Sequence, residues 1–151
     1  MSILVLSPHL LALIRDMAVL IGVLGKNTSQ NIASRLQAFR LVDTVSELQF
    51  VPGDFKKHEE INKHELWSCK LNDTQRLYFI PTTLQHEVGF SCESLSINPN
   101  NEHAVLLVGI VDNAQCIYKG LDYLFTNYDE LRKSWFKSRS TSGHSTQRKT
   151  G

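Results

Sequence analysis

The residues best suited to chemistry lie close together, in the stretch Pro52–Phe79. A Pro-Gly turn leads into a run rich in lysine and histidine, and Arg76 follows in a later segment of alternating residues. His58 and His64 can transfer protons near neutral pH, because an imidazole changes its charge in that range. An arginine can hold a phosphate group through paired hydrogen bonds. This combination predicts a site that binds a phosphate backbone beside a group able to take up or release a proton.

Cations and carboxylates are mixed in the same stretch. Four lysines are expected to contribute to phosphate binding: Lys56, Lys57, Lys63 and Lys70. Three glutamates lie among them: Glu59, Glu60 and Glu65. These carboxylates reduce the local positive charge, so a solvated loop of mixed charge is an alternative interpretation of similar weight. The formal net charge of the chain is only +1, so nucleic-acid binding has to depend on local clustering of cations.

The histidines and cysteines do not have the spacing of a metal site. His58 and His64 are six residues apart, whereas a zinc-binding pair on one helical face is four residues apart. Cys69, Cys92 and Cys116 are widely spaced and fit reduced thiols better than a disulfide framework. The sequence therefore predicts neither a metal nor another cofactor.

A β-hairpin is predicted to position Arg76. Apolar residues alternate with polar ones along Trp67–Leu71, the pair Asn72-Asp73 supplies a turn, and Leu77 resumes the apolar face on the second strand. Alternation places Arg76 and Tyr78 together on the other face of that strand, where they can orient a phosphodiester. The alternative interpretation is a solvated face with a cross-strand charged pair.

Before this stretch, one strand and two helices are expected. Ile3–Leu6 is predicted as a strand and Pro8–Val23 as one buried helix with Ser7 as its cap. Asn27–Ser29 can cap a second, amphipathic helix that ends near Leu41. The apolar N-terminal run lacks an early positive charge and is interrupted by charged residues, so we expect neither a secretory signal nor a membrane span.

After the hairpin, the pattern alternates between loops and strands. Pro81–Gln85 is expected as a loop, His86–Ser91 as a strand, and the continuously apolar His103–Val111 as a central strand covered on both faces. An interrupted helix is predicted over Tyr118–Phe136. The residues from 138 to 151 are basic and rich in Ser and Thr, which is typical of a disordered tail. The domain prediction is a single unit over residues 1–137.

A family resemblance rests on the same motifs. Pro52-Gly53, the thirteen residues up to Trp67, the strand that Trp67 begins, and the run Asn72–Phe79 resemble the host-inhibition-of-growth (killer) toxins of the RelE/ParE superfamily. The similar region extends from about Ile32 to Asp112. The resemblance implies an α+β fold in which a small antiparallel sheet packs against N-terminal helices, here with an extra C-terminal helix.

The resemblance also implies a function. It describes a cytoplasmic toxin of a bacterial toxin–antitoxin system that cleaves messenger RNA, free or on the ribosome, without a metal. Its partners are then a cognate antitoxin and RNA, with no membrane. The implied catalytic residues are Arg76 for transition-state charge, His58 or His64 for proton transfer, and Tyr78 and Asp112 in support. The four lysines named above are the implied substrate-binding residues.

One departure from the family pattern keeps other functions open. Resembled nucleases carry an Asp-Tyr-His type motif where this chain has Asp112, Asn113 and Ala114. A gyrase-inhibiting toxin or a catalytically degenerate binding protein on the same fold is the main alternative. A third is an interaction module whose apolar N-terminal helix docks on another subunit. The sequence does not define the oligomeric state.

Overall fold

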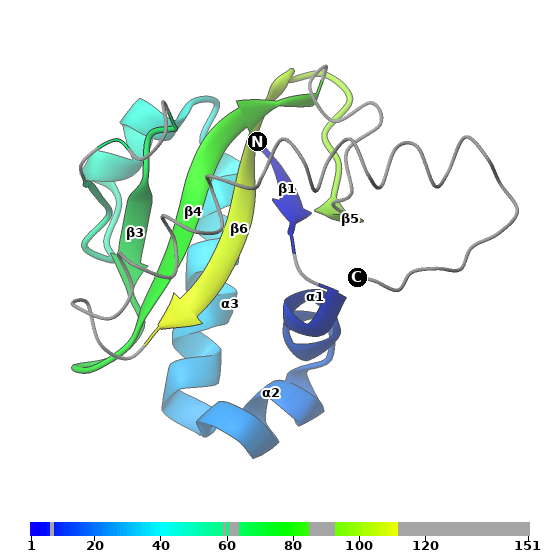
Figure 1. Ribbon diagram of the computed structural model, residues 1–151, viewed down its shortest axis with the longest axis vertical. Coiled ribbons are helices and arrows are strands. Elements are labelled where there is room, and N and C mark those ends of the chain that lie inside the picture. Colours follow the sequence, from blue (N-terminus) through cyan, green and yellow to red (C-terminus); the bar gives the residue numbers. More distant parts are fainter. Residues whose placement is uncertain (7, 59, 61–63, 85–92, 112–151) are drawn as a thin grey trace, which may run out of the picture.

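The computed structural model describes residues 1–111 apart from 7, 59, 61–63 and 85–92. Within them the fold is α+β: helices pack against one face of a six-stranded sheet with the strand order β2-β3-β4-β6-β1-β5 (Figure 1). The helical elements are α1 (Pro8–Arg15), α2 (Met17–Leu24), α3 (Lys26–Leu41) and a short 3-10 helix, η1 (Val45–Phe50). The strands are β1 (Ser2–Val5), β2 (Lys56–Lys57), β3 (Trp67–Lys70), β4 (Arg76–Thr83), β5 (Glu93–Ser96) and β6 (His103–Val111).

The sheet is mostly antiparallel, with β6 near its centre. β6 pairs antiparallel with β4 and parallel with β1, so the sheet is antiparallel, as expected, at every described pairing except the one between β6 and β1. The parallel pair arises because the chain crosses over through the helices and the hairpin before it returns beside β1. The prediction of a central, apolar strand over His103–Val111 is confirmed, since the five residues Ala104–Val108 are buried.

The predicted helix over Pro8–Val23 is in fact two helices. Asp16 adopts an extended conformation and its carboxylate accepts the backbone N–H of Ala18, which caps α2 and ends α1. The expectation that this segment is buried fails for α2. Leu20 is its only buried residue, while Val19 and Val23 are 45% and 63% exposed. α2 lies at one end of the helical layer, beyond the sheet, so only one side of it packs against α1 and α3 (Figure 1).

The helix α3 ends at Leu41 as predicted but begins earlier than expected. Gly25 is its N-cap, with a φ of 87° that favours glycine, and the predicted capping residues 27–29 lie inside the first turns. Ser29 instead donates its hydroxyl hydrogen to the carbonyl of Gly25 over 2.6 Å. Ile32 and Phe39 point into the core against the sheet, so α3 is the main support of the inner face.

An aromatic cluster joins α3 to the strands that carry the candidate residues. The Phe39 ring lies 4.7 Å from the Phe79 ring of β4 and 5.7 Å from the Phe55 ring, both edge-on. Trp67 of β3 stacks beside Phe79 at 6.3 Å. Such pairs add specific geometry to the burial of large apolar side chains. Phe55 therefore anchors the loop that precedes β2 to the helical face of the sheet.

Strand β4 runs further than the sequence pattern indicated. The predicted loop over Pro81–Gln85 is wrong for Pro81–Thr83, because these residues continue the ladder with β6, and Pro81 pairs with Val105. A proline lacks a backbone N–H and is tolerated where one side of a strand needs no ladder bond. The described pairing with β3 ends at Phe79, so Pro81 lies beyond it.

A second buried cluster lies on the face of the sheet opposite the helices. Its residues alternate along the strands with those of the inner core: Leu4, Leu66, Tyr78, Ile80, Ala104, Leu106 and Val108. We call this side of the sheet the outer face. Arg76 begins the same alternation at one end of β4, so the candidate chemistry lies at the edge of an apolar surface.

Several predictions fall on residues outside the described part of the chain. These are Lys63, the strand over His86–Ser91, Asp112 with Asn113 and Ala114, the helix over Tyr118–Phe136, and the tail over residues 138–151. Among the described residues, no helix has both the length and the apolar character needed to cross a membrane.

Candidate phosphate-binding and acid–base site

The predicted hairpin is confirmed and is held by its turn. Trp67 of β3 pairs with Phe79 of β4, and Lys70 pairs with Arg76. The side-chain oxygen of Asn72 accepts the backbone N–H groups of Thr74 and Gln75 at 2.9 and 2.8 Å. An asparagine at this position replaces backbone hydrogen bonds that a tighter Asn-Gly turn would make. The turn therefore fixes the register that brings Arg76 opposite Lys70.

Helix α3 fixes the hairpin against the core. The amide of Asn31 donates to the carbonyl of Leu71 at 2.8 Å, and Arg35 Nε donates to the carbonyl of Lys70 at 2.9 Å. Both acceptors lie at the end of β3, beside the turn. The strand β3, which pairs with the strand that carries the candidate arginine, is thus tied to the longest described helix by hydrogen bonds as well as by packing.

Alternation then sorts the hairpin residues between two faces. Residues directly opposite in an antiparallel pair share a face, so Ser68 lies beside Tyr78 on the outer face, and Arg76 lies one step along. The prediction that Arg76 and Tyr78 share a face is confirmed. Tyr78 and Ser68 are fully buried, whereas the Arg76 side chain is 18% exposed. Arg76 is therefore the member of this group that solvent reaches.

The segment before β3 brings a second set of groups to the same face. Phe55 points into the core, so its neighbours Asp54 and Lys56 point the other way, and Lys56 pairs with Ser68 in the ladder. The backbone N–H of His58 donates to the carbonyl of Leu66 at 2.7 Å and places that residue beside β3. The residue that follows the edge strand β2 thus brings an imidazole to the arginine of β4.

Hydrogen bonds link these residues into one network. Arg76 Nε donates to Ser68 Oγ at 2.7 Å, and Ser68 Oγ lies 2.6 Å from His58 Nε2. Arg76 Nη1 donates to Asp54 Oδ2 and Nη2 donates to the Asp54 carbonyl, each at 2.7 Å. The hydroxyl of Ser68 therefore connects the predicted cation to the predicted proton-transfer group.

The imidazole of His58 is held in a setting that favours its neutral form. Its ring stacks on Tyr78, with centroids 5.5 Å apart. Burial lowers the pKa of His58, and the nearby charges of Arg76 and Lys56 lower it further, while Asp54 acts in the opposite direction. At neutral pH the ring is thus uncharged, which is the form that accepts a proton.

Asp54 closes the network on the solvent side. Its backbone has a φ of 53°, in the left-handed region that aspartate tolerates better than most residues. The preceding residue, Gly53, has a φ of 134°, and a side chain there would collide with Arg35 and Phe55. The hydrogen bond from Arg76 is the main cause that lowers the pKa of the Asp54 carboxyl. The Pro52-Gly53 turn therefore serves to place a charged carboxylate on Arg76.

The lysines are distributed less favourably for phosphate binding than predicted. Lys57 pairs with Trp67 in the ladder and so lies on the opposite face from Ser68, where its ammonium lies 3.7 Å from Glu65. Lys70 is 3.5 Å from Asp73. Lys56 shares the face of the network and, among the described residues, forms no ion pair. Of the three described lysines, Lys56 is thus the one that lies on the face of the candidate site and is not paired with a described carboxylate.

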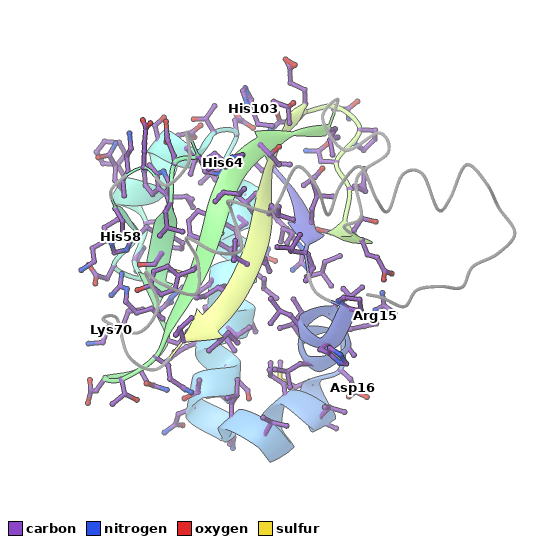
Figure 2. All side chains as sticks on the ribbon, in the orientation of Figure 1. Arg15, Asp16, His58, His64, Lys70 and His103 are labelled. Carbon is purple, nitrogen blue, oxygen red and sulfur yellow. The ribbon has the colours of Figure 1, made fainter. Side chains whose placement is uncertain are left out.

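His64 lies apart from His58. Figure 2 shows it toward the end of the sheet that carries His103, whereas Arg76 pairs with the last residue of β6 at the other end. Of the two predicted histidines, His58 is the one that the network contains. Asp112 lies outside the described residues; β6 ends at Val111, whose partner in β4 is Arg76.

Sequence reasoning missed two members of the network. Ser68 was one of the polar residues in the alternating run Trp67–Leu71, and Asp54 was not singled out. A small polar residue opposite a buried tyrosine was a usable signal for Ser68. Asp54 is separated from Arg76 by twenty-two positions, and no local pattern reveals such a contact.

Two other kinds of chemistry, thiol catalysis and metal binding, find no support among the described residues. Burial raises the pKa of the Cys69 thiol to about 12, so the residue is a packed apolar group and not a nucleophile. Over the described residues, no group of three or more His, Cys, Asp or Glu side chains has the arrangement of a metal site.

Comparisons with protein-family models, with curated proteins and with solved structures found no match for this chain.

Proposed function

We propose that this chain is a metal-independent endoribonuclease that cleaves messenger RNA, the toxin of a toxin–antitoxin pair of the RelE type. The observation that carries the proposal is the link from Arg76 to His58 through the Ser68 hydroxyl, with contacts of 2.7 and 2.6 Å. The placement of a helical layer on one face of a sheet that contains the Trp67 hairpin also supports it, since that is the arrangement the family resemblance implies.

The chemistry assigns a role to each charged or titratable group. His58 takes the proton of the 2′-hydroxyl, and the resulting oxygen attacks the adjacent phosphorus while the bond to the 5′-oxygen breaks. Arg76 stabilises the additional negative charge on the phosphoryl oxygens. The 5′-oxygen takes its proton from water, and Asp112, which lies outside the described residues, keeps only a supporting role. Lys56 binds a neighbouring phosphate.

The base function requires one tautomer of His58. Ser68 Oγ has two lone pairs and can accept hydrogen bonds from Arg76 Nε and from His58 Nε2 together. In that arrangement Nε2 carries the hydrogen, and Nδ1 is the basic nitrogen. Stacking on Tyr78 fixes the plane of the ring and so the direction in which Nδ1 points.

The second candidate is a non-nuclease toxin or binding protein on the same fold. The observation that favours it is the pairing of Arg76 with Asp54, which neutralises the cation that the nuclease needs. A gyrase-inhibiting toxin binds a protein surface and has no need of a free arginine at this position. The two candidates predict different damage in a cell, cut transcripts in one case and DNA breaks in the other.

The experiment that tests the proposal is induced expression in a bacterial host, with growth and RNA 5′ ends recorded together. The wild type is compared with Arg76→Ala and with Arg35→Ala, the matched control, because Arg35 also hydrogen-bonds to the hairpin but lies outside the network. We expect growth arrest with new RNA ends for the wild type and the control, and neither for Arg76→Ala. Full toxicity of a folded Arg76→Ala protein contradicts the assignment, and arrest without new RNA ends favours the second candidate.

A further inference from the structure

Arg76 already binds an anion, and that anion belongs to the chain itself. The guanidinium donates from Nη1 to a carboxylate oxygen of Asp54 and from Nη2 to the carbonyl of the same residue, each at 2.7 Å. Carboxylates and phosphates offer a guanidinium similar pairs of oxygen acceptors. A phosphodiester that approaches this edge of Arg76 therefore meets the position that the Asp54 carboxylate occupies.

The carboxylate can leave that position without disturbing the rest of the network. The Asp54 side chain is 53% exposed, so it can turn into solvent and does not become a buried, unpaired charge. Ser68 continues to hold Nε, and the Asp54 carbonyl continues to hold Nη2. Only Nη1 loses its acceptor, and it remains oriented toward the vacated position.

We propose that Asp54 is a displaceable internal ligand of Arg76, and that a phosphate group of RNA binds this site by exchange with the Asp54 carboxylate. The inference rests on the proposed function, because that function supplies the phosphodiester. Exchange makes Arg76 a weak site for isolated anions and a better one for a ligand with further phosphates, which Lys56 on the same face can bind. Asp54 thus favours a polyanion over a single phosphate ion.

The chain offers a matched pair of substitutions to test the exchange. Asp54→Asn removes the carboxylate charge and keeps a residue that tolerates a φ of 53°. Asp73→Asn changes the net charge equally, and its carboxylate is 99% exposed beside Lys70. Asp54→Gly serves as a second variant, since glycine favours this backbone conformation and removes the side chain. A far-ultraviolet spectrum and a cooperative melting curve show that each variant is folded.

The first measurement is a titration with inorganic phosphate, followed by the backbone amide signals of the hairpin in nuclear magnetic resonance spectra. We expect Asp54→Asn and Asp54→Gly to bind phosphate about tenfold more tightly than the wild type, as one charge-assisted hydrogen bond becomes available. Asp73→Asn should stay within about twofold of the wild type, and Arg76→Ala added to Asp54→Asn should remove the gain. Equal affinities of Asp54→Asn and Asp73→Asn, or no binding by Asp54→Asn, overturn the exchange.

Cleavage of messenger RNA by the same proteins, both as a free oligonucleotide and bound to ribosomes, separates the two proposals. If Asp54→Asn gains phosphate affinity but neither it nor the wild type cuts RNA, the exchange stands and the endoribonuclease proposal fails. If the wild type cuts RNA in a reaction that depends on Arg76, while Asp54→Asn binds phosphate no better than the wild type, the function stands and the exchange fails. A gain for an acidic peptide but not for phosphate contradicts the exchange with RNA and indicates a protein ligand.

Discussion

Replacement of Ser68 by alanine is the most direct test of the network. Ser68 is fully buried, and its hydroxyl contacts Arg76 Nε at 2.7 Å and His58 Nε2 at 2.6 Å. The bond from the guanidinium involves a charged donor and contributes about 1.5–3 kcal/mol, and the bond with the imidazole about 0.5–1.5 kcal/mol. We therefore expect Ser68→Ala to lower the free energy of unfolding by about 2–4 kcal/mol.

The measurement is chemical denaturation of the wild type, Ser68→Ala and a control, Ser46→Ala. Ser46 lies in η1 and its hydroxyl contacts only the exposed Thr44 hydroxyl at 3.1 Å, so its replacement should cost less than about 0.5 kcal/mol. A double-mutant cycle that combines Ser68→Ala with His58→Phe should give a coupling free energy of at least about 0.5 kcal/mol. A Ser68→Ala protein as stable as the control, with no coupling to His58, refutes the network and with it the positioning of the imidazole.

Three further predictions concern pH, packing and thiol reactivity. The pKa of His58 is lowered from 6.5 in the folded protein, so the unfolded chain takes up this proton first as the pH falls. The free energy of unfolding should therefore decrease from about pH 7 toward the folded pKa. His58→Phe should flatten that part of the pH profile, and an unchanged slope contradicts the shift. Leu20→Ala should cost about 2–4 kcal/mol of unfolding free energy, because Leu20 is 1% exposed. Val23 is 63% exposed, so Val23→Ala should cost less than about 0.5 kcal/mol of unfolding free energy. Similar losses for Leu20→Ala and Val23→Ala in denaturant melts would mean that the exposed side of α2 is also buried, and would contradict this packing. Burial raises the pKa of the Cys69 thiol to about 12, so this cysteine should resist a thiol reagent at pH 8 and react once urea unfolds the chain. The measurement uses a variant whose other cysteines are replaced by serine. Rapid labelling of the folded protein contradicts the burial of Cys69.

Elements with a strong local pattern could be predicted from the sequence. The Trp67 hairpin and the central strand over His103–Val111 lie where alternation or a continuous apolar run placed them, and the first strand, expected over Ile3–Leu6, forms one residue earlier over Ser2–Val5. The C-terminal end of α3 at Leu41 was also predictable from its apolar spacing. In each case the residues that form the element carry the signal themselves.

The errors occur where a contact between distant or competing groups decides the structure. The break between α1 and α2 depends on Asp16 capping the second helix, which an apolar average over the segment conceals. The continuation of β4 through Pro81 depends on where the pairing with β3 ends. The exposure of α2 depends on the shape of the helical layer, which a hydrophobic run cannot specify.

The candidate site shows the same division between local and long-range information. Alternation was enough to place Arg76 and Tyr78 on one face, but the sequence left open whether His58 or His64 joins them, and the structure brings His58 to the network. The partners of these residues were not predictable, because Asp54 reaches Arg76 only through the turn at Gly53 and the anchoring of Phe55 in the core. A sequence pattern thus identified the groups that can react but not the groups that hold them.

The pairing of cations with carboxylates limits how the proposed enzyme can bind RNA. Three of the predicted cations lie in ion pairs, Arg76 with Asp54, Lys57 with Glu65 and Lys70 with Asp73. Each exposed pair is weak, but each also reduces the number of counterions that an RNA strand releases when it binds. Lys56 is the described lysine on the network's face outside these pairs, so the described part of this face supplies little affinity for free RNA. A nuclease built in this way depends on a larger partner to present the phosphodiester, which favours RNA held on the ribosome over RNA in solution as the substrate of the proposed reaction.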